Sequence, residues 1–257
     1  MFFFEWKEVL ILFIGGMLVT NGSNIINQII ERTSDKEMKR TRTRPLPAGR
    51  MGVQEAWIIT LISAVAGITI LWVYFNALTG ILSFISLLLY AFAYTPMKKI
   101  HPVATFIGAI PGALPPLIGW AAATGSIFAG TDLVGWTLFM VQFFWQFPHF
   151  WAIAWLGYEE YLKAGISMLP SKEGKTSFTG LQCMFYALPL IPVGMLPYFL
   201  QVVGKTGSIF AVGFGVFFTL MAINFYLKSD NRSAKKLLYS SFIYLPGVLL
   251  SFALDKL

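Results

Sequence analysis

Charged side chains and cysteine are scarce in this sequence. Only 12% of the 257 residues are Asp, Glu, Lys or Arg, about half the share of a typical soluble domain. The single cysteine, Cys183, excludes an intrachain disulfide and a thiolate metal site, and in its apolar segment it is expected to pack. We expect no cleavable signal peptide, because no basic region precedes the first apolar run.

Apolar residues are abundant instead, at 56% of the chain with a mean hydropathy of +0.68. The apolar runs are continuous and long enough to cross a bilayer as helices, which excludes the alternating pattern of barrel strands. We predict an all-α, polytopic transmembrane bundle formed by one domain, residues 1–257. The eight predicted spans are 8–30, 54–75, 78–95, 103–123, 134–157, 178–201, 207–227 and 236–254.

The net charge of +7 is distributed in a way that argues against nucleic acid as a partner. All basic residues except Lys7, Lys205 and Lys256 lie in or beside four of the short connections between spans. Such an excess of Lys and Arg marks cytoplasmic loops. We therefore predict that these four loops are cytoplasmic, that both termini face outward, and that the lipid bilayer is the main partner.

The first basic loop follows a regularly spaced set of oxygen-bearing side chains. Asn27, Glu31 and Asp35 recur every four residues, so a helix places them on nearly one face. Carboxylate and amide oxygens suit Mg²⁺, and the basic residues that follow suit diphosphate oxygens. These are Lys39, Arg40, Arg42 and Arg44. The pattern predicts a site for a metal-bound polyanion, although a solvated helix end with internal salt bridges fits it as well.

A second acidic pair, Glu159 and Glu160, lies in another basic loop with Lys163 close behind. By the predicted topology it opens on the same side of the membrane as Asn27, Glu31 and Asp35. Glu160 could then provide a further metal contact. An ordinary exposed loop is the alternative interpretation of this pair.

Two predicted spans contain unusual residues for a membrane helix. The segment 101–125 carries four prolines, which remove backbone donors and kink or break a helix; it either lines a cavity or is a kinked packing helix. The aromatic segment 143–155 contains Gln146 and His149, and polar groups at such a depth usually face a bundle interior or a wet cavity. His149 could bind a ligand, hold a metal or satisfy a neighbouring carbonyl.

Four separated stretches resemble the UbiA superfamily of intramembrane prenyltransferases, and within it the heme O synthase family. Asn27, Glu31 and Asp35, followed by the first stretch, resemble the superfamily's first aspartate-rich motif. The four stretches are MKRTRTRPLPAG (38–49), IGAIPGALPPLIGWAAATG (107–125), FFWQFPHFWAIAW (143–155) and EEYLKAGISMLP (159–170). Their number and order make the resemblance specific.

The chain also departs from the family pattern. Glu31 and Glu160 stand where the family usually has Asp, which lengthens the reach to a metal ion. The family has about nine helices, whereas this chain shows eight apolar runs. Its first run matches the family's second helix, so the resemblance implies that the first helix is missing.

The resemblance implies an enzyme that transfers a farnesyl group from farnesyl diphosphate to a vinyl group of heme b, giving heme O in a bacterial cytoplasmic membrane. Implied partners are heme A synthase or terminal oxidase assembly proteins. Asn27, Glu31, Asp35, Glu159 and Glu160 are the implied catalytic residues. Mg²⁺ is assigned to Asn27, Glu31, Asp35 and Glu160, diphosphate to Lys39, Arg40, Arg42, Arg44 and Lys163, and heme to His149, Gln146 and Trp151.

Three other functions remain open from the sequence. A related prenyltransferase could act on another aromatic acceptor. A transporter would also have broken helices and buried polar residues. A non-catalytic heme-handling protein is the third alternative.

Overall fold

The structure, a computed structural model, describes residues 5–257, with the side chain of Thr131 excepted. Helices dominate this part of the chain. Its described residues form no β-strand, only an isolated antiparallel bridge between Val203 and Lys256. The all-α prediction is confirmed.

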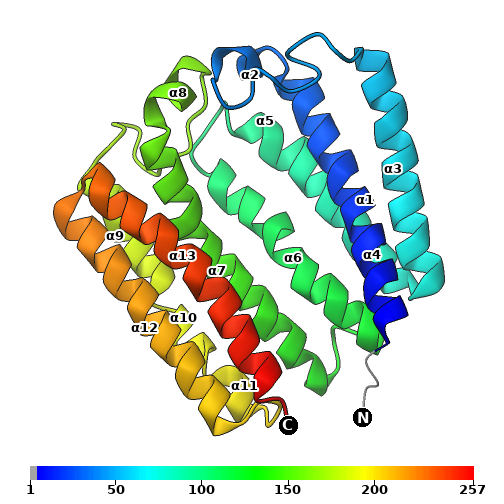
Figure 1. Ribbon diagram of the computed structural model, residues 1–257, viewed down its shortest axis with the longest axis vertical. Helices are drawn as coiled ribbons and strands as arrows, with labels where there is room; N and C mark the ends of the chain where they lie inside the picture. The colour runs from blue at the N-terminus through cyan, green and yellow to red at the C-terminus, as the bar shows by residue number, and fades with distance from the viewer. Residues whose placement is uncertain (1–4) are drawn as a thin grey trace.

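Long helices alternate with short ones along the chain (Figure 1). The first half contains α1 (Trp6–Glu31), α2 (Ser34–Glu37), α3 (Val53–Tyr74), α4 (Ala77–Leu88), α5 (Thr95–Met97) and α6 (Ala104–Thr124), with a π-helical segment, Leu89–Tyr94, joining α4 to α5. The second half contains a 3₁₀ turn (Gly130–Asp132), α7 (Leu133–Leu156), α8 (Tyr158–Lys163), α9 (Ser177–Ala187), α10 (Leu190–Val193), α11 (Leu196–Phe199), α12 (Lys205–Lys228) and α13 (Asn231–Leu254).

Each predicted span coincides with helical structure. The predicted and observed ends differ most at the start of α13. This helix begins at Asn231 rather than at residue 236. The Asp230 side chain accepts a hydrogen bond from the Ser233 backbone N–H at 2.7 Å and caps the first turn. Hydropathy misses this turn because its residues are polar.

Seven helices within residues 5–257 are long and apolar enough to cross a membrane, so the chain is an integral, multi-pass membrane protein. The predicted count of eight is not confirmed. The additional predicted span corresponds to α7, a 24-residue helix that is not among the seven. Gln142, Gln146 and His149 lower the hydropathy of α7.

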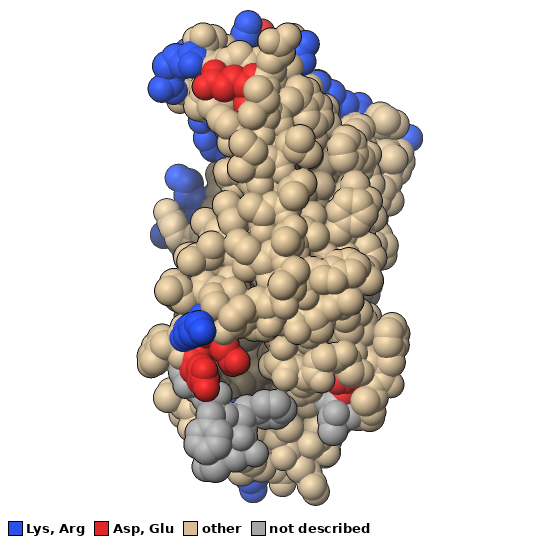
Figure 2. All heavy atoms as spheres, turned by 90° about the vertical axis from the view of Figure 1, so that its right-hand side faces the viewer, with Lys and Arg blue, Asp and Glu red and all other residues tan. Residues whose placement is uncertain are grey.

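The long helices pack side by side in chain order. α1 lies against α3, α3 against α4, α4 against α6, and α6 against α7; α7 then contacts α9 and α13, and α12 packs between α9 and α13 (Figure 1). Figure 2 shows one side of this bundle, where most of the surface between the charged groups near its two ends carries no charged side chain. A surface of this kind suits lipid contact.

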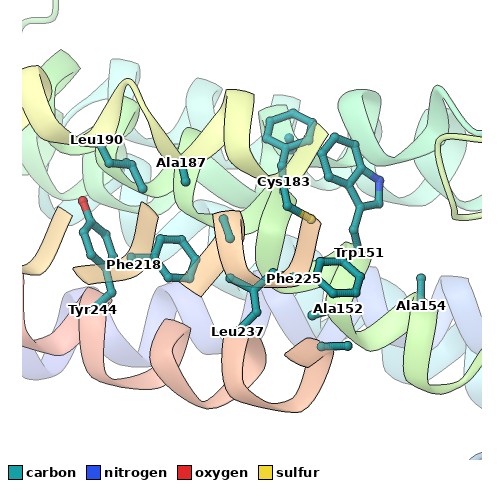
Figure 3. Close-up of a cluster of buried hydrophobic side chains, with 14 of the residues drawn as sticks. Trp151, Ala152, Ala154, Cys183, Ala187, Leu190, Phe218, Phe225, Leu237 and Tyr244 are labelled. Carbon is teal, nitrogen blue, oxygen red and sulfur yellow. The ribbon is translucent and has the colours of Figure 1, made fainter. Parts of the chain in front are cut away.

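The largest apolar core lies in the second half of the bundle, between α7, α9, α12 and α13 (Figure 3). Phe218 of α12 stacks on Tyr244 of α13 with ring centroids 5.2 Å apart. Cys183 of α9 is fully buried in this cluster as a free thiol, as its apolar segment predicts.

Proline has opposite effects in two regions. The span predicted at 178–201 is divided into α9, α10 and α11, with Pro189, Pro192 and Pro197 at or near the breaks. By contrast, α6 is one continuous helix although it contains three prolines, so of the predicted kink or break the break is not observed. Pro115 leaves the Pro111 carbonyl without its helical donor, and the Ser86 hydroxyl of α4 donates to that carbonyl at 3.3 Å.

Candidate active site

The last turn of α1 carries two of the predicted site residues into the protein interior. Asn27 and Glu31 are both buried, one helical turn apart. The Asn27 carboxamide donates to Glu31 Oε2 at 2.9 Å and to the Thr95 hydroxyl oxygen at 3.2 Å. The predicted common face therefore holds for Asn27 and Glu31, and it points at α5 rather than at solvent. Asp35 does not share it, because α1 ends at Glu31 and Asp35 lies in α2.

Glu31 forms an ion pair with Lys98, whose Nζ lies 2.8 Å from Oε1. The Lys98 side chain is only 9% exposed and the Glu31 side chain 4%, so both charges have lost most of their water. Burial lowers the pKa of Lys98, while the Glu31 carboxylate acts in the opposite direction by favouring the charged ammonium. The Lys98 ammonium also lies 4.8 Å from the centre of the Tyr94 ring.

A π-helical segment, Leu89–Tyr94, precedes α5 and brings these groups to the site. Thr95 follows it directly and donates its hydroxyl to the Tyr90 carbonyl at 2.9 Å. Segments of this kind are rare and frequently occur at functional sites, because the wider turn redirects the side chains that follow.

Asp35 of α2 is completely buried and pairs with Arg44, whose Nη1 lies 2.9 Å from Oδ2. Arg44 belongs to a loop of consecutive turns, in which Gly49 adopts a positive φ of 71° that favours glycine. The Thr41 hydroxyl donates to the Asp35 carbonyl at 3.0 Å and fixes the loop against α2. Asp35 Oδ1 is buried and has no hydrogen-bond partner.

The loop that follows the first acidic region meets the second acidic region at a pocket of about 360 Å³. Met38 and Arg40 line it from the loop after α2, and Glu159, Glu160 and Tyr161 line it from α8. Its remaining lining comes from the end of α7, from Gly157 and from Leu238 of α13. Both regions thus lie at one end of the bundle, where α2, α5 and α8 gather in Figure 1.

The segment 164–170, which is part of the family resemblance, is mostly packed into the protein. Gly165 takes a positive φ of 67° after α8, and the chain turns back toward α5. The Ser167 N–H then donates to the Lys98 carbonyl at 2.9 Å, and the Thr105 hydroxyl donates to the Met168 carbonyl at 3.3 Å. This segment therefore connects the second acidic region to the residue that neutralises Glu31.

The four predicted metal ligands do not form one compact set. Among residues 5–257, no group of three or more His, Cys, Asp or Glu side chains lies close enough together to hold a metal ion. Glu31 and Asp35 provide two carboxylates, fewer than such a group needs, and the third, Glu160, lines the neighbouring pocket. The donor chemistry still fits Mg²⁺, which binds through one or two carboxylates plus substrate phosphates. Asp35 Oδ1 is an unpartnered oxygen of the required kind.

The predicted diphosphate contacts are in different environments. Arg44 is partly buried in its ion pair with Asp35. The other four, Lys39, Arg40, Arg42 and Lys163, are exposed, and Arg40 lines the pocket. Exposed cations at a pocket mouth can move to meet an incoming anion.

The three predicted heme contacts point to three different neighbours of α7. Gln146 donates its amide to the Ala109 carbonyl of α6 at 2.8 Å. His149 Nδ1 lies 2.7 Å from the Ser241 hydroxyl of α13, and its ring stacks on Trp145. Trp151 packs edge-on against Tyr186 of α9. The structure does not bring these three side chains together into one contact set.

Lys98 is the main residue that sequence reasoning missed as part of the site. In the sequence it counts only as one of the basic residues after a span. The available signal was its spacing: Lys98 lies four residues after Tyr94, so it shares a helix face with an aromatic ring and points back toward the span.

Comparison with known proteins finds relatives that cover almost the whole chain. The model of the UbiA prenyltransferase family matches residues 2–245. A curated relative from Cytophaga hutchinsonii, named protoheme IX farnesyltransferase, is 47% identical over 256 residues. The alignment covers 98% of this chain and 87% of the relative.

Solved structures give the same fold at lower identity. A digeranylgeranylglyceryl phosphate synthase structure matches with a TM-score of 0.81 and 21% identity, covering 98% of this chain and 86% of the other. A UbiA homolog from Archaeoglobus fulgidus, bound to GPP and Mg2+, matches with a TM-score of 0.68 and 14% identity, covering 97% and 89%.

The buried ion pair of Lys98 with Glu31 generates a stability prediction. Lys98→Met leaves Glu31 buried without its cation, and we expect the free energy of unfolding to fall by about 3–5 kcal/mol. Lys99→Met is the matched control, since Lys99 is exposed, and it should change the value by less than about 0.5 kcal/mol. Equilibrium unfolding in mixed detergent micelles measures both.

A double variant, Glu31→Gln with Lys98→Met, distinguishes the cost of an unpaired Glu31 carboxylate from a general loss of stability caused by replacing Lys98. It should lose less stability than Lys98→Met alone, because no uncompensated carboxylate remains. Equal loss in the Lys98→Met and Lys99→Met proteins would contradict the pairing.

Proposed function

The chain belongs to the UbiA prenyltransferase family, and from that premise we propose that it transfers a farnesyl group from farnesyl diphosphate to a vinyl group of heme b. Water adds to the product, so heme b, farnesyl diphosphate and water give heme O and diphosphate. The observation that carries this proposal is the 47% identity to a protoheme IX farnesyltransferase across 98% of the chain. Residues 1–257 act as one domain in this proposal.

The charged end of the bundle supports the diphosphate half of the reaction. A departing diphosphate gains negative charge, which must be neutralised where it develops. Mg²⁺, when bound, supplies part of that neutralisation. Asn27, Glu31 and Asp35 would hold it from one side, with Glu159 or Glu160 contributing from the adjoining pocket.

The cations that now pair with the carboxylates are suited to bind the diphosphate. Arg44 and Lys98 compensate Asp35 and Glu31 in the structure. We assign both to the diphosphate oxygens, because they would be free to bind an anion if the carboxylates held Mg²⁺. Arg can bind two such oxygens at once, whereas Lys acts as a point charge. The exposed diphosphate contacts are Lys39, Arg40, Arg42 and Lys163.

The apolar lining of the pocket suits the farnesyl chain and the allylic cation that forms from it. The allylic cation left by diphosphate departure must be kept from bulk water until the vinyl carbon attacks. Met38, Ile153, Leu156 and Leu238 provide apolar walls beside the acidic residues. A long isoprenoid chain is well accommodated by such surfaces within a helix bundle.

For the acceptor, we assign His149 to the heme iron or a propionate. It combines an imidazole with neighbouring aromatic rings, Trp145 and Phe242, that suit a flat macrocycle. Gln146 and Trp151 face other helices, so we assign them to the walls that shape the acceptor pocket on the α6 and α9 sides.

We place the charged end of the bundle in the cytoplasm of a bacterial cell, with the helices in its cytoplasmic membrane. The loops at this end carry most of the basic residues, which is the charge pattern of cytoplasmic loops. Product heme O would pass to heme A synthase or to terminal oxidase assembly proteins.

Incubation with labelled farnesyl diphosphate tests the acceptor. Purified protein with Mg²⁺ should transfer label to heme b and not to 4-hydroxybenzoate, and chromatography of the extracted product measures both. Transfer to 4-hydroxybenzoate alone would favour another aromatic acceptor, and no transfer to either would favour a non-catalytic heme-handling role.

Substitution of a buried carboxylate tests the metal site. We expect Asp35→Ala to reduce heme O formation by about 100-fold or more, since a transition-state charge contact is lost. Glu37→Ala is the matched control, because Glu37 lies in the same short helix but is exposed. Heme O is quantified in membranes after immunoblotting confirms equal insertion. Full activity of the Asp35→Ala enzyme would remove Asp35 from the site.

Heme titration followed by absorbance tests His149. In the His149→Ala protein the Soret shift that heme binding produces should be lost or altered, because a coordinating imidazole sets the iron spectrum. Ser241→Ala is the control, since it removes the hydrogen-bond partner of His149 but leaves the imidazole. An unchanged shift in His149→Ala would exclude this residue as the iron ligand.

A further inference from the structure

A second polar pocket, of about 220 Å³, lies where α12 ends and α13 begins. It is lined by Asn224, Lys228, Asp230, Arg232, Ser233 and Lys236. Lys236 and Leu238 lie two residues apart on α13, so they project from opposite faces of the helix. Because Leu238 lines the candidate active site, the second pocket opens on the other side of α13.

The pocket is built from two helical faces that oppose each other. Asn224 and Lys228 are four residues apart on α12, and Arg232 and Lys236 are four apart on α13, so each pair shares a face. The two helices pack together along their length. Three cations and one carboxamide therefore converge on a single hollow.

The positive charge of this pocket is only partly balanced by the protein, since three cations line it beside a single carboxylate. Within residues 5–257 the ion pairs are Arg44 with Asp35 and Lys98 with Glu31, so Lys228, Arg232 and Lys236 have no carboxylate at ion-pair distance. The one carboxylate in the lining, Asp230, accepts hydrogen bonds from the Ser233 N–H and hydroxyl, both at 2.7 Å. Three like charges around a hollow repel one another, and a bound anion relieves that repulsion.

The location of the pocket identifies the kind of anion. α12 and α13 are both membrane-spanning by length and composition, and the pocket lies at the end of one and the start of the other, where lipid phosphates are found. Leu227 and Tyr239 are exposed beside it, and tyrosine is typical of the membrane interface. We propose that this pocket binds a phosphate group, supplied by the headgroup of an anionic phospholipid.

Titration calorimetry on the full chain in neutral detergent tests the proposal with three probes. These are short-chain phosphatidylglycerol, short-chain phosphatidylcholine and inorganic phosphate. We expect saturable binding of phosphatidylglycerol and weak binding of the other two. Each basic residue near an anionic lipid contributes a factor of about five, so Arg232→Gln with Lys236→Gln should weaken phosphatidylglycerol binding about 25-fold.

Lys235→Gln is the matched control, because Lys235 is an exposed lysine of the same helix that does not line the pocket. It should alter the affinity by less than about twofold. If the double variant fails to fold, Lys228→Gln alone gives the same comparison, with an expected loss of about fivefold. Thermal unfolding of each protein checks folding before titration.

The outcomes separate the sources of the phosphate. Selective binding of phosphatidylglycerol that depends on Arg232 and Lys236 supports a lipid site. Equally tight, pocket-dependent binding of inorganic phosphate supports the phosphate site and assigns it to a free anion instead. Non-saturable binding, or equal loss in the Lys235→Gln protein, would overturn the proposal, because the effect would then reflect overall charge alone.

Discussion

Burial of two carboxylates at one end of an apolar bundle is the constraint on which the site depends. Glu31 and Asp35 each lie almost entirely out of water, and an unpaired charge there is very costly. Each is therefore matched by a cation from another segment: Lys98 from beyond α5 and Arg44 from the loop after α2. The turns of that loop and the π-helical segment before α5 position these two cations.

Both cations are also the groups that a diphosphate would attract. A site built in this way has its positive and negative groups paired with each other before substrate arrives. A metal-bound diphosphate would offer the carboxylates a cation and the cations an anion in one ligand, so the total charge would stay balanced. Under the proposed function, this exchange would explain why charged residues are buried where apolar residues would otherwise be expected.

Helix α7 shows how polar residues in a span serve the packing of a membrane bundle. Without water, each backbone or side-chain polar group needs a partner inside the protein. Gln146 satisfies a carbonyl of α6 and His149 contacts a hydroxyl of α13. The sequence left open whether these side chains face a bundle interior or a wet cavity, and the structure has them connect α7 to two different neighbours. Their spacing on one helix did not reveal which neighbours those were.

The sequence alone determined the helical class, the approximate spans, the charge asymmetry and the resemblance to prenyltransferases. These properties are local, because the burial of an apolar run in lipid depends mainly on its own residues. Tertiary structure decided the pairing of Glu31 with Lys98, the meeting of Arg40 with Glu159 and Glu160, and the pocket between α12 and α13. Each of these joins separate elements, so it depends on how helices pack, and hydropathy and spacing within a single helix contain no information about that.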